Sequence, residues 1–177
     1  AKEKPLEKDI TDMPEFVEAK KKTEEEISKL MKVDGSLAVD EVHRELGKIV
    51  WDKIGMARNE KGLKSALEEI PKIKQKFWSQ ISIPGDDKDV NQELEKALRI
   101  KDFIELAELM AHDALDRKES CGAHFREEYQ TEENEAKRND KDYKYVAAWE
   151  YSEEKSPQLF KEELQYKNVK LKTRSYK

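Results

Sequence analysis

The sequence lacks the features of several large classes of protein. It contains no run of about 18 apolar residues, so it predicts no transmembrane helix. Its charged first residues include no apolar segment of the kind found in a secretory signal peptide. The only cysteine, Cys121, cannot form an internal disulfide and suits a reducing compartment. We therefore expect no direct insertion into a membrane.

Glycine is also scarce, with six residues among 177. No two glycines stand two positions apart, which excludes a GxGxxG dinucleotide loop, and no GxxxxGK[ST] phosphate loop occurs. Lys and Arg are interleaved with Asp and Glu, and the net charge is −5, so the sequence gives little support for a nucleic-acid surface. The residues by themselves predict no self-sufficient catalytic machinery.

Charged residues, by contrast, are abundant. Charged residues make up 42% of the chain, against about 25% in a typical globular domain. Leu, Ile, Val and Phe together supply 37 of the 177 residues, just above the share of roughly 20% below which disorder is expected. The composition therefore predicts one modest hydrophobic core with broad solvated faces.

The apolar spacing predicts four helices. The first begins near Asp12 and ends at Asp34–Gly35, and its charged middle lets it pack only at its two ends. Pro71 lies inside the third helical pattern and predicts a kink or break at Ile70. The fourth pattern is the most apolar, with Leu106 widening its stripe, and should be the most buried. The short connections favour antiparallel neighbours, and the four helices are expected at residues 12–34, 36–55, 63–81 and 89–117.

Beyond Gly122 the pattern changes. Residues 124–142 are highly polar and predict a long solvated loop, whereas aromatic residues alternate over 143–151 and predict a strand. A second strand is expected around Phe160, Leu164 and Tyr166, and a third around Val169, Leu171 and Thr173. Such a small sheet must lean on the bundle or on another chain. The fold class is thus mainly α, an antiparallel three-helix bundle with an extra N-terminal helix and a small strand-bearing C-terminal piece, and the expected divisions are 1–36, 37–121 and 122–177.

Cys121 and His124 are the first candidates for chemistry, because a thiol three residues from an imidazole could form a nucleophile–base pair or half of a metal site. A structural zinc site needs four such ligands, and the only other histidines, His43 and His112, fall on two different expected helices. We therefore expect no metal site. The simpler interpretation is that Cys121 packs at a helix end and that His43 and His112 lie at the edge of the core.

Two further features allow more than one interpretation. Asp113 and Asp116 flank His112 on a charged helix side, where a solvated surface is the simplest expectation. The aromatic strand at 143–151 could be an exposed docking surface, since aromatic residues are enriched where partners bind, or it could pack on the bundle. Exposure of apolar positions such as Phe16 and Val17 would favour a dimer of the chain.

One segment carries a specific resemblance. Residues 116–129 read DRKESCGAHFREEY and resemble the signature R-x-E-S-R-G-A-H-x-R-x-D-x-P of succinate dehydrogenase and fumarate reductase flavoprotein subunits. The resemblance extends back through the W-x-x-x-G-x-x-R pattern of 51–58 and forward to the R-S-Y of 174–176, and it covers about residues 37–177. Cys121 stands where the common signature has Arg, and no proline follows Glu128 and Tyr129.

The resemblance implies a spectrin-like three-helix bundle and an enzyme that interconverts succinate and fumarate by hydride transfer with FAD. In that family the FAD-binding and capping domains lie N-terminal to this region and hold the flavin and the dicarboxylate. This chain would then be a C-terminal fragment with no catalytic, cofactor-binding or metal residue. Its partners would be those preceding domains and the iron–sulfur subunit, in a cytoplasmic complex peripheral to the inner membrane.

The resemblance also implies a structural or interface role for the motif residues. Glu119, His124 and Arg126 are expected to fix the junction between bundle and tail, and Ser120, Gly122 and Ala123 complete the motif. Two alternatives stay open at this point. One is a free-standing helical interaction module with no redox role, and the other is a small thiol-dependent enzyme that uses Cys121.

Overall fold

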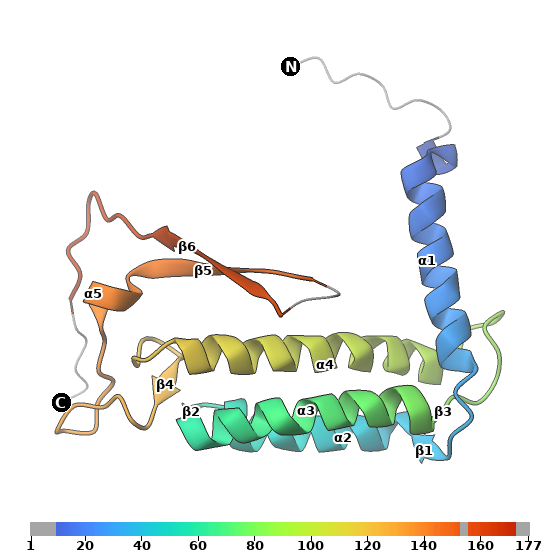
Figure 1. Ribbon diagram of the computed structural model, residues 1–177, viewed down its shortest axis with the longest axis horizontal. Coiled ribbons are helices and arrows are strands. Elements are labelled where there is room, and N and C mark those ends of the chain that lie inside the picture. The colour runs from blue at the N-terminus through green and yellow to red at the C-terminus, as the bar shows by residue number, and fades with distance from the viewer. Residues whose placement is uncertain (1–9, 153–155, 173–177) are drawn as a thin grey trace.

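In the computed structural model of the chain, which describes residues 10–152 and 156–172, three long helices lie side by side (Figure 1). Successive helices run in opposite directions, as the colour gradient shows, and the first helix stands out from one end. The helical elements are a 3₁₀ turn at Ile10–Asp12, α1 at Pro14–Met31, α2 at Val39–Ile49 with a π-helical turn at Val50–Ile54, α3 at Glu60–Gln80, α4 at Gln92–Asp116 and α5 at Asp140–Tyr143. The mainly α fold and its four long helices are confirmed.

The strands are short and pair across long stretches of sequence. Leu37–Ala38 (β1) pairs in parallel with Ile81–Ser82 (β3), and Ala57–Arg58 (β2) pairs in parallel with Phe125–Arg126 (β4). These two pairs hold opposite ends of the bundle (Figure 1). Tyr145–Glu150 (β5) and Gln158–Glu163 (β6) form an antiparallel hairpin in which Trp149 pairs with Leu159.

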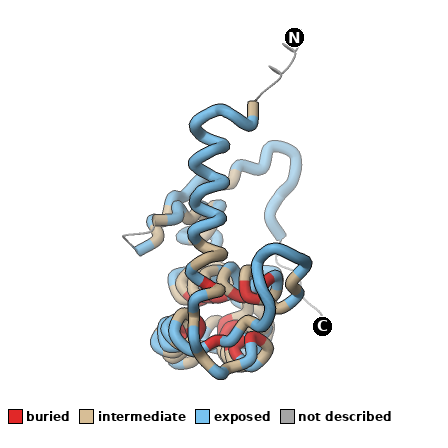
Figure 2. Tube along the Cα trace, turned by 90° about the vertical axis from the view of Figure 1, so that its right-hand side faces the viewer, coloured by how far each residue is buried: buried red, intermediate tan, exposed pale blue. Residues whose placement is uncertain are grey.

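The core lies where α2, α3 and α4 face one another, and the end-on view shows it as the buried centre of the bundle (Figure 2). Large apolar side chains come from α2, α3 and α4, and α4 adds several alanines. Small side chains let α3 approach α4 closely, so this modest core still excludes water. The fully buried members include Val42, Leu63, Ala66, Ile70, Phe77, Ala97, Ala111 and Ala114.

The sequence patterns explain where the helices begin. The side chain of Asn59 accepts a hydrogen bond from the Gly62 amide at 2.8 Å and begins α3. Asn91 does the same for α4, accepting from the amides of Glu93 and Leu94. A Cβ atom at Gly35 would lie 1.9 Å from the Gln80 carbonyl oxygen, so only glycine lets the connector after α1 cross the end of α3.

Several expectations about the helices were wrong. Of the kink or break expected at Ile70, the break does not occur, because α3 continues through Pro71, which is exposed so that water can bind the carbonyl that loses its amide donor. Leu106 was expected to widen a buried stripe but is exposed on α4, because the hairpin and neighbouring helices leave that side open.

The C-terminal expectations need three corrections. Residues 124–142 are not one solvated loop, because Phe125 and Arg126 form β4 and Arg126 is buried. The second strand includes Phe160 but ends before Leu164 and Tyr166. The described residues up to 172 contain no third strand at Val169 and Leu171, and Thr173 and the R-S-Y segment lie outside the described residues. Within the expected strand over 143–151, residues Tyr145–Glu150 are confirmed as β5, whereas Tyr143 belongs to α5 and Tyr151 lies outside the strand. The domain boundaries at 36 and 121 stay a prediction.

We predict that Pro71→Ala stabilises the chain. Alanine restores the missing helical hydrogen bond and removes the ring clash, and the gain should approach about 3 kcal/mol because a proline in a helix interior costs about that much. Urea denaturation measures the free energy of unfolding. Lys72→Ala, at the exposed neighbouring position, should change it by less than about 0.5 kcal/mol. A less stable Pro71→Ala chain would contradict this account of α3.

Candidate functional site

Arg126 places a buried cation at the C-terminal end of α4. Its side chain is 1% exposed, and Nη1 donates to the carbonyl oxygens of Ala114 at 2.8 Å and Leu115 at 3.4 Å. Carbonyls in the last turn of a helix lack amide donors and carry the negative end of the helix dipole. Nε of Arg126 also donates to Glu128 at 3.1 Å, and the guanidinium lies 5.4 Å from the ring of Tyr129. These partners offset the cost of burying the charge.

Ser120 holds the backbone of Arg126 in place. Its buried hydroxyl accepts from the Arg126 amide at 2.8 Å and donates to the Arg126 carbonyl at 3.2 Å. Between these residues the chain makes a tight turn, closed by two backbone hydrogen bonds between Cys121 and His124 at 2.8 and 3.1 Å. Gly122 adopts φ +60° in this turn, which favours glycine. Ala123 completes the exposed tip of the turn.

Glu119 links the same turn to the C-terminal piece. This carboxylate is 3% exposed, and it accepts from Arg117 Nη1 at 2.7 Å and from the Asn139 amide at 2.7 Å. The guanidinium of Arg117 also donates to the carbonyls of Tyr143 at 3.1 Å and Tyr145 at 3.2 Å. The pair of half-buried Arg117 and buried Glu119 therefore ties the end of α4 to the start of β5.

His124 bridges two arginines with its two ring nitrogens. Arg58 Nη1 lies 2.9 Å from Nδ1, and Nε2 lies 2.9 Å from the Arg117 carbonyl oxygen. Because a guanidinium can only donate, Nδ1 accepts and Nε2 carries the proton that is donated to the carbonyl. Burial lowers the pKa of His124 below its ordinary value, and the nearby charges of Arg58 and Arg126 lower this pKa further. The site thus holds a neutral imidazole in one tautomer.

The start of α3 completes the junction. Asn59 Nδ2 donates to Glu127 at 2.7 Å, and the Glu60 amide donates to Glu128 at 2.5 Å. Burial acts to raise the pKa of Glu128, but the Glu60 amide and the Arg126 guanidinium outweigh that effect and hold the pKa below its ordinary value. The carboxylate stands at a helix N-terminus, where negative charge is favoured.

Aromatic side chains of α5 and β5 bond to Asp113 and Asp116 of α4; both carboxylates were expected to be solvated, and Asp116 does remain exposed. Trp149 Nε1 donates to Asp113 at 2.8 Å, and the hydroxyls of Tyr143 and Tyr145 bond to the carbonyl and carboxylate of Asp116 at 3.2 and 3.4 Å. The alternate residues of β5 with aromatic side chains are half-buried. The aromatic strand therefore packs on the bundle. The sequence offered one signal for this contact that was missed: the strand carries hydroxyl and indole donors, and α4 carries carboxylates that can accept from them.

The Cys121 hypotheses find no geometric support. Cys121 was expected to pack at a helix end, but it is exposed, because it lies in the tight turn that faces solvent. Both ring nitrogens of His124 already have other partners. His43 is exposed on α2 and stacks on Phe103 with ring centroids 5.9 Å apart, so it lies outside the core. His112 is half-buried on α4. Within the described residues, no group of three or more His, Cys, Asp and Glu side chains is placed to hold a metal ion.

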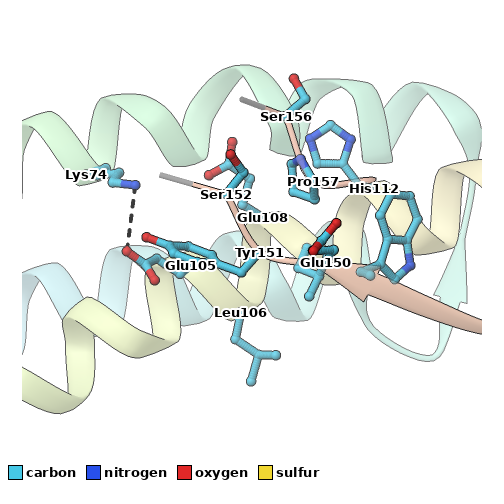
Figure 3. A pocket seen from close by; sticks show the side chains of 12 residues that line it. Lys74, Glu105, Leu106, Glu108, His112, Glu150, Tyr151, Ser152, Ser156 and Pro157 are labelled. Carbon is cyan, nitrogen blue, oxygen red and sulfur yellow. Dashed lines mark ion pairs between the residues drawn. The ribbon is translucent and has the colours of Figure 1, made fainter. Parts of the chain in front are cut away.

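An open cavity of about 510 Å³ lies between α4 and the hairpin end. Figure 3 shows His112 there, with Lys74 paired to Glu105 at 3.9 Å. Glu108 and Glu150 add two further carboxylates to the wall. A dicarboxylate or a pyrophosphate needs convergent cations, so the charges here do not fit succinate, fumarate or the FAD pyrophosphate.

Comparison with known proteins places this geometry in context. The family model described as fumarate reductase flavoprotein C-term matches residues 43–176. An uncharacterized FAD-dependent oxidoreductase of Methanocaldococcus jannaschii is 35% identical over 60% of this chain and 19% of its own length. The fumarate reductase flavoprotein subunit of Helicobacter pylori is 30% identical over 76% of this chain and 18% of its own length. The chain spans about a fifth of the length of these relatives.

Solved structures with a similar fold come from enzymes of the same kind. The structure of an E. coli quinol fumarate reductase aligns with a TM-score of 0.74 at 20% identity, covering 88% of this chain and 26% of that chain. In the part of this chain that the structure describes, no helix is both long and apolar enough to cross a membrane.

We predict that Arg126→Met destabilises the chain by about 3 kcal/mol. Methionine keeps much of the side-chain length but removes the charged hydrogen bonds to the Ala114 carbonyl and to Glu128, each worth roughly 1.5–3 kcal/mol. Urea denaturation measures the loss. Arg99→Ala is the matched control, because Arg99 forms an exposed pair with Glu95 that should contribute no more than about 1 kcal/mol. Equal losses in the two variants would refute the role of Arg126.

His124 gives the junction a pH dependence of defined sign. The folded chain holds its pKa below the ordinary 6.5, so the unfolded chain takes up a proton first as the pH falls. Stability is therefore complete above about pH 6.5 and declines as the pH falls through that value toward the folded pKa. His124→Gln should lose less stability than the wild type between about pH 7.5 and 5.5, measured by urea denaturation at each pH. His43→Gln, at an exposed site, should follow the wild type, and identical slopes for all three chains would contradict the prediction.

Proposed function

We propose that this chain is the C-terminal structural and docking domain of a flavoprotein subunit that interconverts succinate and fumarate, because it belongs to the fumarate reductase flavoprotein C-terminal family. The match over residues 43–176 carries the proposal. The relatives named above are about five times longer than the stretch that they share with this chain. In the proposed subunit, FAD would supply hydride transfer from domains that precede this one.

The described residues themselves support a binding role rather than a chemical one. The motif side chains Glu119, Ser120, His124 and Arg126 engage one another or the ends of α3 and α4, which leaves none of them free to attack a substrate. Gly122 and Ala123 shape the turn between them. We assign these six residues a structural and interface role. Isolated from the preceding domains, the chain would have no succinate or fumarate activity.

Exposed apolar side chains near the junction support docking. Trp51 is 84% exposed and Met56 is 89% exposed, and both lie in the segment that connects α2 to β2. Large exposed apolar and aromatic side chains are frequent anchors of interfaces. A shallow apolar groove of about 280 Å³ lies between α2 and α4, lined in part by Phe103, Leu106 and Met110. The proposed occupants of these surfaces are the FAD-binding and capping domains and the iron–sulfur subunit, within a cytoplasmic complex peripheral to the inner membrane.

The first experiment tests capture and chemistry separately. A tagged form of this chain is co-expressed with the FAD-binding and capping domains and the iron–sulfur subunit encoded in the same genome. We expect the chain alone to be colourless and to show no succinate-dependent dye reduction, and the captured assembly to carry the flavin. Trp51→Ser should weaken capture at least tenfold without unfolding the chain, whereas Lys72→Ser, on an exposed face of α3, should not.

Two outcomes would overturn the proposal in different ways. Binding to neither partner would favour the free-standing interaction module with no redox role. An activity of the isolated chain that disappears in Cys121→Ala would favour the thiol-dependent enzyme, although the engagement of both His124 ring nitrogens leaves Cys121 without that base.

A further inference from the structure

Helix α1 stands away from the bundle with most of its length in water (Figures 1 and 2). Residues 14–25 of the helix are all exposed, and only its last turns contact the core. A helix that is polar on all sides is typical of a segment that crosses solvent between two folded parts, provided that its own side chains stabilise it. The exposed part of α1 therefore needs a source of stability other than a covered face.

The base of α1, residues 26–31, is fixed on the bundle by three contacts. Leu30 is fully buried in the core. Lys29 Nζ lies 4.4 Å from the centre of the Trp78 ring on α3, and Glu26 pairs with Lys101 on α4 at 2.5 Å. Because these contacts involve two different helices, they set the direction of α1 as well as its position. The packed base also supplies the first helical turn, which is the costly step in helix formation.

Charged side chains one turn apart support the shaft of α1, residues 18–25. Three ion pairs between positions i and i+4 overlap along it, at distances of 3.2 to 3.7 Å. Each such pair favours the helix slightly, and together they act on consecutive turns. At the far end, Pro14 begins the helix and Glu15 places negative charge in the first turn, where the helix dipole favours it. The three pairs are Glu18–Lys22, Lys20–Glu24 and Lys21–Glu25.

Apolar side chains gather only at the free tip of the helix, residues 13–17. Met13, Phe16 and Val17 are each about half exposed there. Ala19 is the only apolar residue of the shaft. A partner helix packs against apolar positions that recur in every turn, so the shaft has no face that such a partner could cover.

We propose that α1 is a rigid, self-supporting spacer, which holds the residues that precede it at a fixed direction and distance from the bundle. The base provides the first turn, and the ion pairs of the shaft extend it through water. At about 1.5 Å per residue, the 18 residues of the helix span about 27 Å. The inference does not depend on the flavoprotein assignment, because it rests only on contacts within this chain.

A distance measurement between spin labels tests the rigidity of the whole chain. In a Cys121→Ser background, nitroxide labels are attached at Glu15→Cys near the tip and at Lys72→Cys on the exposed side of α3. Pulsed dipolar electron paramagnetic resonance should give one narrow distance distribution. A broad distribution would overturn the proposal, because it would show a helix that frays or bends. The chain labelled at position 15 alone should give no short distance, and a short distance would also overturn the proposal, since a second copy would then cover the helix.

Charge variants test the ion pairs of the shaft. Lys20→Glu, Lys21→Glu and Lys22→Glu combined should broaden the distribution about twofold, because Lys and Glu have similar helix propensities but the shaft would then carry only negative charge. The matched control replaces the same three lysines by arginine, which keeps every pair, and should stay as narrow as the wild type. Near-ultraviolet circular dichroism should show the same folded bundle in all these chains. A glutamate variant as narrow as the wild type would contradict the role of the ion pairs and overturn the proposal.

A variant of the tip tests whether an apolar cover holds the helix instead. Phe16→Ala combined with Val17→Ala removes the large apolar side chains, and alanine has the highest helix propensity. A self-supporting spacer predicts an unchanged, narrow distribution. Broadening in this variant would show that contacts of the tip hold α1 in place, and would overturn the proposal.

Discussion

A single buried guanidinium holds the end of this molecule together. Arg126 satisfies the last carbonyls of α4, bonds to a carboxylate at the start of α3, and has its own backbone fixed by Ser120. Because a buried cation without partners is costly, the turn, the two helix ends and the short β2–β4 pair form a mutually dependent set. His124 joins that set only as a neutral base, since three arginines surround it. The same dependence explains why the motif's chemistry-bearing side chains bond to one another and to the ends of α3 and α4.

The arrangement suits the docking role that we propose. The polar side chains of the motif form their hydrogen bonds within the junction, whereas large apolar side chains such as Trp51 and Met56 are exposed beside it. At the opposite end, α1 stands clear of the bundle over most of its length, and only its last turns pack on the core.

Patterns of local spacing predicted much of the fold and part of the site. Helical periodicity located all four long helices, and the alternating aromatics located β5, because each pattern reflects one buried face. The motif pointed to Glu119, His124 and Arg126, all of which lie at the junction. The roles of Arg58 and Arg117 were missed, since each acts on residues distant in sequence or through backbone carbonyls. Asp113 was taken for a solvated residue because nothing local shows that Trp149 of the hairpin bonds to it, whereas Asp116 is exposed as expected.

The sequence by itself determined the helices, the family and the absence of nucleotide-binding loops, because these depend on periodicity and on motifs of a few adjacent residues. Only the tertiary structure decided which charges are buried, which histidine nitrogen holds the proton, and that α3 continues through Pro71. Those outcomes depend on which groups meet across long separations, and burial is a property of the assembled fold. The residues around Arg126 in the sequence would be the same whether its side chain were exposed or buried. Only the packing of the folded chain buries this guanidinium and lets it bond to the end of α4.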